Sequence, residues 1–122
     1  MPRPEFTIGV KVQHLPDRSD AENHAYAYTI TIRNTGDVKA QLIARHWLIT
    51  DATGHVEETR GLAVVGHQPL LAPGEQFEYT SWARIATPYG TMRGTYYCIT
   101  EDARPFETPI PEFALARSEA LH

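Results

Sequence analysis

The sequence predicts an all-β protein, an antiparallel sandwich of two sheets of the immunoglobulin or fibronectin type III kind. Three observations lead to this prediction. Apolar and polar residues alternate along several short segments, turn-forming residues separate these segments, and no segment longer than about eight residues keeps a helical period. A closed barrel made of the same strands is the alternative architecture.

The first three predicted strands have the clearest patterns. Residues 6–12 (FTIGVKV) and 26–32 (YAYTITI) place an aromatic or β-branched residue at every second position. Such residues suit a pleated surface with one buried face. Residues 40–50 are apolar on both parities, which predicts a central strand covered on both faces, with Trp47 in the core of the sandwich.

Three further strands are predicted at residues 75–82, 95–100 and 106–115. Tyr96 follows a glycine at the start of a late strand, the position of a tyrosine corner. In the last strand Pro109 and Pro111 cannot donate ladder hydrogen bonds, so this strand belongs at a sheet edge. Its apolar residues also change from even to odd positions, which predicts a β-bulge near Pro111.

Turns are predicted where glycine, proline and Asn or Asp cluster, at residues 34–37 (NTGD), 51–54 (DATG), 72–75 (APGE) and 88–90 (PYG). Glycine allows a positive φ, and Asn or Asp side chains bond to the nearby backbone. The 122 residues fit one domain, residues 1–122, with a structured core at about 6–115 and a frayed tail at 116–122.

Composition excludes several classes of protein. Apolar residues are 42% and charged residues 21% of the chain, the composition of a globular protein and not a disordered one. The net charge of -4 and the scattered Lys and Arg argue against nucleic-acid binding. A single cysteine allows no intrachain disulfide, and with no secretory leader and no apolar stretch of about 20 residues we expect a cytoplasmic protein without membrane insertion.

No set of catalytic groups is visible, so we expect no enzyme activity and no cofactor. Ser81 lacks a nucleophile-elbow motif, and Cys98 lies mid-strand, where a buried and inert thiol is expected. The histidines His46, His55 and His67 lack the tight spacing of metal ligands, so no metal site is predicted.

The stretch at residues 60–75 (RGLAVVGHQPLLAPGE) allows two interpretations. Its glycines resemble part of a phosphate-binding loop, whose candidate residues are Gly61, Val64, Val65, Gly66 and His67. A nucleotide, a pyrophosphate or a divalent metal would be the ligand. However, Pro69 and Pro73 oppose the helix that such a loop needs at its end. The favoured interpretation is therefore a turn and sheet-edge segment.

A protein-binding surface is the remaining possibility. An exposed tryptophan is a good interface anchor, and in a regular strand Trp82 points away from Phe77 and Tyr79. Tyr89 and the basic residues Arg84 and Arg93 lie near it in sequence and complete the candidate contact set. We therefore expect a small binding module with an unidentified protein partner, either a monomer or a two-fold homodimer.

Taken together, the motifs resemble the bacterial ApaG proteins, also called CorD. The segments that carry this resemblance are 42–51 (LIARHWLITD), 61–69 (GLAVVGHQP), 71–75 (LAPGE), 77–81 (FEYTS) and 90–96 (GTMRGTY). They occur in order over nearly the whole chain, from about residue 6 to residue 115. The resemblance implies a fibronectin type III-like sandwich and a protein-recognition role, since related domains occur in eukaryotic multidomain proteins.

The resemblance also implies an association with cobalt resistance and magnesium efflux, without an established mechanism. The glycine motif of the family has been likened to a nucleotide-binding pattern. This chain departs from the family pattern at two positions: Ala63 stands in place of the middle glycine, and Trp82 in place of a glycine after Tyr-Thr-Ser. A β-methyl group at position 63 would obstruct the approach of a pyrophosphate to the backbone.

Overall fold

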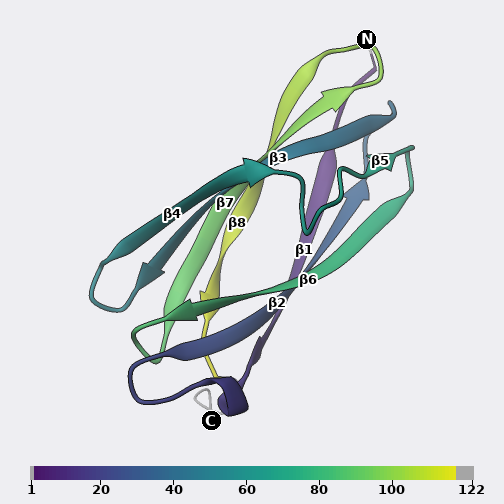
Figure 1. The fold of residues 1–122 in the computed structure, drawn as a ribbon. Helices are drawn as coiled ribbons and strands as arrows, with labels where there is room; N and C mark the ends of the chain where they lie inside the picture. Colours follow the sequence, from purple (N-terminus) through teal and green to yellow (C-terminus); the bar gives the residue numbers. More distant parts are fainter. Residues whose placement is uncertain (1, 118–122) are drawn as a thin grey trace.

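The computed structural model describes residues 2–117, and these residues form two antiparallel β-sheets packed face to face (Figure 1). Sheet A contains, in spatial order, β1 (Phe6–His14), β2 (His24–Asn34) and β6 (Gln76–Ile85). Sheet B contains, in spatial order, β4 (Val56–Leu62), β3 (Ala40–Asp51), β7 (Gly90–Thr100) and β8 (Pro105–Leu115), and the short β5 (Leu70–Leu71) pairs with the start of β3. The predicted β-sandwich is confirmed.

The alternation of residues 26–32 determines which face of sheet A is buried. Ile30 and Ile32 of β2 are fully buried against sheet B. Thr29 and Thr31, which alternate with them, lie on the opposite face, where the Thr29 hydroxyl bonds to that of Thr80 at 2.8 Å. Burying one isoleucine side chain contributes about 1.5–3 kcal/mol, so the opposite register would lose several kcal/mol in this strand alone.

Trp47 lies at the centre of the core, as predicted. Only 3% of its surface is exposed, and its ring meets Tyr28, Tyr96 and Phe113 edge to face at centroid distances of 5.5, 6.2 and 6.0 Å. Edge-to-face contacts place the positive rim of one ring against the negative face of another. The indole therefore joins residues from β2, β7 and β8 into one packed cluster.

The final strand contains the predicted bulge. Met92 of β7 pairs with Phe113, whereas Gly94 pairs with Ile110, so β8 contains one residue more than β7 between these two pairs. The extra residue near Pro111 keeps both Ile110 and Leu115 on the buried face. β8 pairs only with β7 among the described strands, and its predicted place at a sheet edge is therefore confirmed.

The tyrosine-corner prediction for Tyr96 is wrong. Tyr96 lies within β7 opposite Arg45 of β3, and its side chain crosses the core, where its hydroxyl bonds to that of Tyr79. A tyrosine corner would instead bond to backbone near the start of a strand. Another tyrosine, Tyr26, donates to the Pro88 carbonyl in the turn between β6 and β7.

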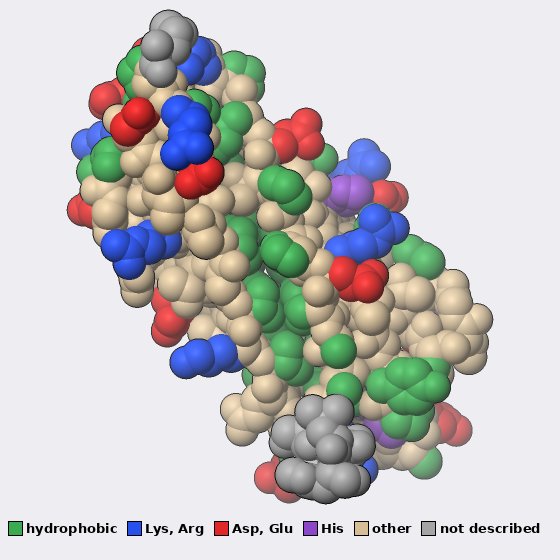
Figure 2. Space-filling model, turned by 180° about the vertical axis from the view of Figure 1, so that it is seen from behind, with side chains coloured by type: hydrophobic (Ala, Val, Ile, Leu, Met, Phe, Trp, Pro, Cys, Tyr) green, Lys and Arg blue, Asp and Glu red, His purple; other side chains and the backbone are tan. Residues whose placement is uncertain are grey.

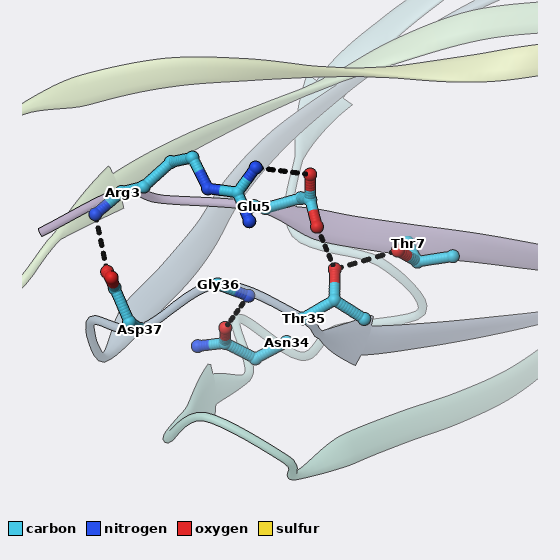
Figure 3. Close-up of polar contacts among 7 residues, drawn as sticks. All are labelled: Arg3, Glu5, Thr7, Asn34, Thr35, Gly36 and Asp37. Carbon is cyan, nitrogen blue, oxygen red and sulfur yellow. Dashed lines mark hydrogen bonds and ion pairs between the residues drawn. The ribbon is translucent and has the colours of Figure 1, made fainter.

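The chain before β1 is held against the turn that joins β2 to β3 (Figure 3). The Thr35 hydroxyl donates to the Glu5 carboxylate at 2.8 Å, and the backbone N–H of Arg3 donates to Asp37. Gly36 is required here because a Cβ atom would lie 2.4 Å from the Arg3 carbonyl oxygen. These contacts extend the ordered structure to residues that precede the predicted core.

Figure 2 shows the molecule from behind, where hydrophobic side chains collect along the middle of the face and charged side chains lie on both sides of them. Partly buried hydrophobic residues of β1 and β8, among them Ile8, Val10 and Phe113, pack against the core cluster. β1 and β8 also contact each other across the two sheets. The core therefore extends to the side of the sandwich formed by these two strands.

Candidate functional site

The glycine-containing stretch lies on the opposite side of sheet B from β8. β4 and β5 both pair with β3, on the same side of it, and residues 63–69 connect them (Figure 1). Gly61 lies inside β4, opposite Arg45. Gly66 lies in the connection, and no helix follows it, because Pro69 leads directly into β5. The stretch therefore forms a strand end, a tight turn and a second short strand.

The turn itself is a two-residue hairpin. The N–H of Val64 donates to the His67 carbonyl at 2.8 Å, and the N–H of His67 donates to the Val64 carbonyl at 2.9 Å. Val65 and Gly66 between them have φ angles of 48° and 79°, the positive values of a type I′ turn. Glycine suits this backbone, whereas a β-branched valine is strained in it.

Arg45 explains the need for glycine at position 61. Its side chain lies on the inner face of sheet B with Trp47, and its Nη1 donates to the carbonyls of Leu62 and Ala63 at 2.7 and 2.8 Å. A Cβ atom on Gly61 would lie 2.9 Å from Nη1 and from Nη2 of this guanidinium. Gly61 thus makes room for an arginine that fixes the end of β4.

The connection closes one side of the sandwich. Val64 is fully buried in the core, and the His67 ring lies 5.5 Å from the ring of Phe77 on β6 in the other sheet. The N–H groups of Val64 and His67 are already used within the turn. Of the predicted phosphate-loop residues, Gly61, Val64 and His67 therefore serve packing and turn contacts in this structure.

The outer side of the same region is apolar. Leu62 is 71% exposed, and in the register of sheet B it lies in one row with Ala44 and Tyr97 on the outer face. Val65 of the turn and Leu70 of β5, which follow Leu62 along the chain, are 56% and 50% exposed. We name these five residues the Leu62 surface. A shallow pocket of about 460 Å³ opens beside Ala44, Leu62 and Tyr97.

Charged groups border the Leu62 surface. His46 and Arg60 both contact the Glu58 carboxylate, at 2.7 and 3.3 Å. The hydrogen bond from His46, and next that from Arg60, holds the pKa of Glu58 below its ordinary value. Glu58 and Arg60 are exposed members of β4, so the apolar surface has a polar rim along one side.

The predicted contact residues do not form one surface. Trp82 is 53% exposed on the outer face of sheet A, where the Arg84 guanidinium lies 5.4 Å from its ring centroid. Arg93 lies on the outer face of sheet B, next to Leu48. Tyr89 lies in the turn between β6 and β7, beside a different pocket. The outward direction that parity predicts for Trp82 is confirmed.

Reactive groups are few among residues 2–117. Burial raises the pKa of the Cys98 thiol to about 11, and its sulfur lies 3.7 Å from the Thr108 hydroxyl. The predicted burial of this thiol is confirmed. Within the same residues, no three His, Cys, Asp or Glu side chains gather as metal ligands would. No helix of the described part is long and apolar enough to cross a bilayer.

Comparison with known proteins identifies the family. Residues 14–100 match the family model of the ApaG domain. The chain belongs to the ApaG family. Protein ApaG of Ralstonia nicotianae is 61% identical over the whole length of both chains, and Protein ApaG of Bordetella pertussis is 53% identical over 97% of this chain and 92% of its own.

A crystal structure supports the same placement. The putative ApaA protein from Bordetella pertussis superposes with a TM-score of 0.92 at 53% sequence identity, covering 94% of this chain and 95% of its own. The backbone at position 63 explains why glycine suits it better than the alanine of this chain. Ala63 has a φ of 67°, so the position needs a left-handed backbone that glycine adopts without strain.

Sequence reasoning did not find the Leu62 surface. Residues 56–62 alternate in no regular way, because every residue of β4 except Gly61 is exposed and no face of the strand is buried. Tyr97 was visible as an aromatic residue, but its neighbours Ala44 and Leu62 come from two other strands. Only the strand register brings these three side chains together.

Proposed function

We propose that this ApaG-family chain is a non-catalytic binding domain that recognises a protein partner through the Leu62 surface. The concentration of exposed hydrophobic side chains carries this proposal. Of the seven large hydrophobic residues that are exposed in the described chain, four belong to this surface: Leu62, Val65, Leu70 and Tyr97. Single exposed leucines are ordinary, whereas a contiguous group marks an interaction site.

The composition of the surface suits a protein partner. Tyr97 offers a ring with a polar tip, and tyrosine is enriched among residues that dominate binding energies. Leu62 and Leu70 supply apolar area around it, and the Glu58 and Arg60 pair supplies a charged rim. An apolar centre inside a polar rim is the usual anatomy of a protein–protein interface.

The edge of sheet B supports the same proposal. β4 pairs with β3 on one side, and no described strand pairs with its other side. An unpaired edge can accept an extended segment of a partner by main-chain hydrogen bonds. Leu62 at the end of this edge is placed to contact the side chains of such a segment.

Site-specific photo-crosslinking tests the proposal. One variant carries benzoyl-phenylalanine at position 62, and a second variant carries it at position 82 on the opposite face of the sandwich. Both variants are expressed in the organism from which the chain comes, and the cells are irradiated. We expect discrete adducts with a protein other than the chain itself from position 62 only. Absence of adducts from position 62, or the same adducts from both positions, would refute the assignment.

The outer face of sheet A is the second candidate for the recognition surface. The contact of Arg84 with the Trp82 ring presents an aromatic and a cation together, which suits an acidic partner. Adducts from position 82 alone would favour this face. The same experiment therefore decides between the two sides of the sandwich.

A further inference from the structure

A polar pocket lies inside the sandwich, at the side that the Val64 turn closes. Its volume is about 200 Å³, and residues of both sheets line it. Tyr28, Tyr79 and Ser81 come from sheet A, and Arg45 and Trp47 come from sheet B. Its lining residues come from both sheets and the turn, and Val65 is the one residue that it shares with the Leu62 surface.

Arg45 brings a positive charge into this pocket. The residue is only partly exposed, and none of the ion pairs within residues 2–117 involves it. Nη1 is occupied by the carbonyls of Leu62 and Ala63. The protons on Nε and Nη2 have no hydrogen-bond acceptor among the described residues, and guanidinium groups so placed match the oxygens of carboxylate or phosphate.

The hydroxyl groups of the pocket add neutral donors. Tyr28 and Ser81 are paired in the register of sheet A, and both line the pocket. Tyr79 stands next in the same inner face and bonds to Tyr96. Burial raises the pKa of both Tyr28 and Tyr79, while the charge of Arg45 acts in the opposite direction on each. The phenols therefore remain protonated and able to donate at neutral pH.

The wall of the pocket is also strained. Val65 lines it with a φ of 48°, and the preceding Ala63 has a φ of 67°. Two non-glycine residues in the left-handed region, within three positions, persist only where surrounding contacts impose them. The bond from Arg45 to the Ala63 carbonyl is one such contact. Strained backbone of this kind concentrates at binding sites.

We propose that this pocket binds a single oxyanion group, a phosphate or a carboxylate. The Nε and Nη2 groups of Arg45 would hold two oxygens, and the hydroxyls of Tyr28 and Ser81 would complete the contacts. A compact anion suits the volume, and the site uses side-chain donors instead of the backbone of the glycine stretch. The site shares Val65 with the Leu62 surface, but its proposed donors, Arg45, Tyr28 and Ser81, are not part of that surface.

Titration of tryptophan fluorescence tests this proposal, since Trp47 lines the pocket. A Trp82→Phe background removes the second indole of the chain. Inorganic phosphate and acetate are the two probes, each compared with sodium chloride at equal ionic strength. We expect a saturable change with at least one of them, and the stronger of the two identifies the group that the site prefers.

Three variants locate the response. Arg45→Gln is expected to weaken binding by about tenfold or more, and Tyr28→Phe by about threefold or more, because each removes a donor to a charged group. Arg84→Gln removes an exposed cation from the outer face of sheet A and should leave binding unchanged. Tyr28→Phe keeps the carbonyl contacts of Arg45, so it remains informative even where Arg45→Gln disturbs the turn.

The proposal is overturned by any of the following results. They are no response beyond that to chloride, a response that does not saturate, and a saturable response that both Arg45→Gln and Tyr28→Phe leave unchanged. Loss of the response in Arg84→Gln together with its retention in Tyr28→Phe would place the anion on the outer face and would also overturn it.

Discussion

Replacing Val65 by asparagine should stabilise the fold. Val65 occupies the first central position of the hairpin turn with a φ of 48°, and Gly66 follows with a φ of 79°. Asn-Gly is the preferred pair for a type I′ turn, because asparagine tolerates the left-handed backbone that a β-branched residue resists. The substitution therefore changes a strained pair into a favourable one without moving the backbone.

The magnitude follows from two opposing effects. A left-handed conformation costs an ordinary L-residue roughly 1–2 kcal/mol, and asparagine recovers most of this. Val65 is 56% exposed, so the loss of its methyl groups costs less than about 0.7 kcal/mol. Val65→Ala serves as the matched control, because it removes the same methyl groups and keeps the backbone strain.

Urea unfolding of the three proteins measures the effect. We expect Val65→Asn to exceed Val65→Ala by about 1 kcal/mol in the free energy of unfolding, at an unchanged denaturant slope. In thermal unfolding the same difference corresponds to about 3–6 °C. An asparagine variant that is no more stable than the alanine variant would refute the interpretation that the turn is strained.

Three other predictions concern the core, a buried amide and the thiol. Gly94→Ala should lower the free energy of unfolding by more than about 3 kcal/mol, because the new Cβ would lie 2.1 Å from the His46 carbonyl oxygen. Gly9→Ala is the control: its Cβ would have its nearest neighbour at 3.8 Å, so the same urea assay should show a change of less than about 0.5 kcal/mol. Asn34→Ala should lower the free energy of unfolding by about 2–4 kcal/mol, since the Nδ2 group donates to two backbone carbonyls at 2.9 and 2.8 Å that would stay buried and unpaired. Unfolding followed by circular dichroism measures this loss, and a loss below about 1 kcal/mol would contradict the stabilising role of the amide. Burial raises the pKa of the Cys98 thiol to about 11, so the unfolded chain loses this proton first as pH rises, and the free energy of unfolding should fall between about pH 9 and pH 11. Cys98→Val should make that decline shallower when unfolding is measured at about pH 8 and pH 10. An identical decline in both proteins would show that the thiol does not contribute.

Strands with one buried face could be predicted from sequence. Burial of alternate residues leaves a period of two in the sequence. This period predicted the strands at residues 6–12 and 26–32, and its interruption predicted the bulge near Pro111. The exclusion of a helix after Gly66 also holds, because proline restricts the backbone locally. In each case the physical cause lies within a few residues of its effect.

The edge strands and the candidate sites depend on distant residues. β4 has exposed residues on both faces, so its strand conformation comes from pairing with β3 and left no apolar pattern. The charge of Arg45 inside the sandwich was not predicted either. The alternation along a strand indicates which face a side chain is on, but not which residues of other strands surround it. Tyr96 was misread for the same reason, since its hydroxyl partner Tyr79 belongs to the other sheet.

The size of the complexes that the chain forms in native lysate tests the protein-recognition proposal most directly. Tagged wild-type chain, Leu62→Glu and Trp82→Glu are compared by gel filtration of lysate, after each purified protein has been shown to be folded. We predict that wild type and Trp82→Glu elute partly in a fraction of higher mass, and that Leu62→Glu elutes only at the volume of the isolated chain. The same distribution for all three proteins, or loss of the larger species in Trp82→Glu alone, would contradict recognition through the Leu62 surface.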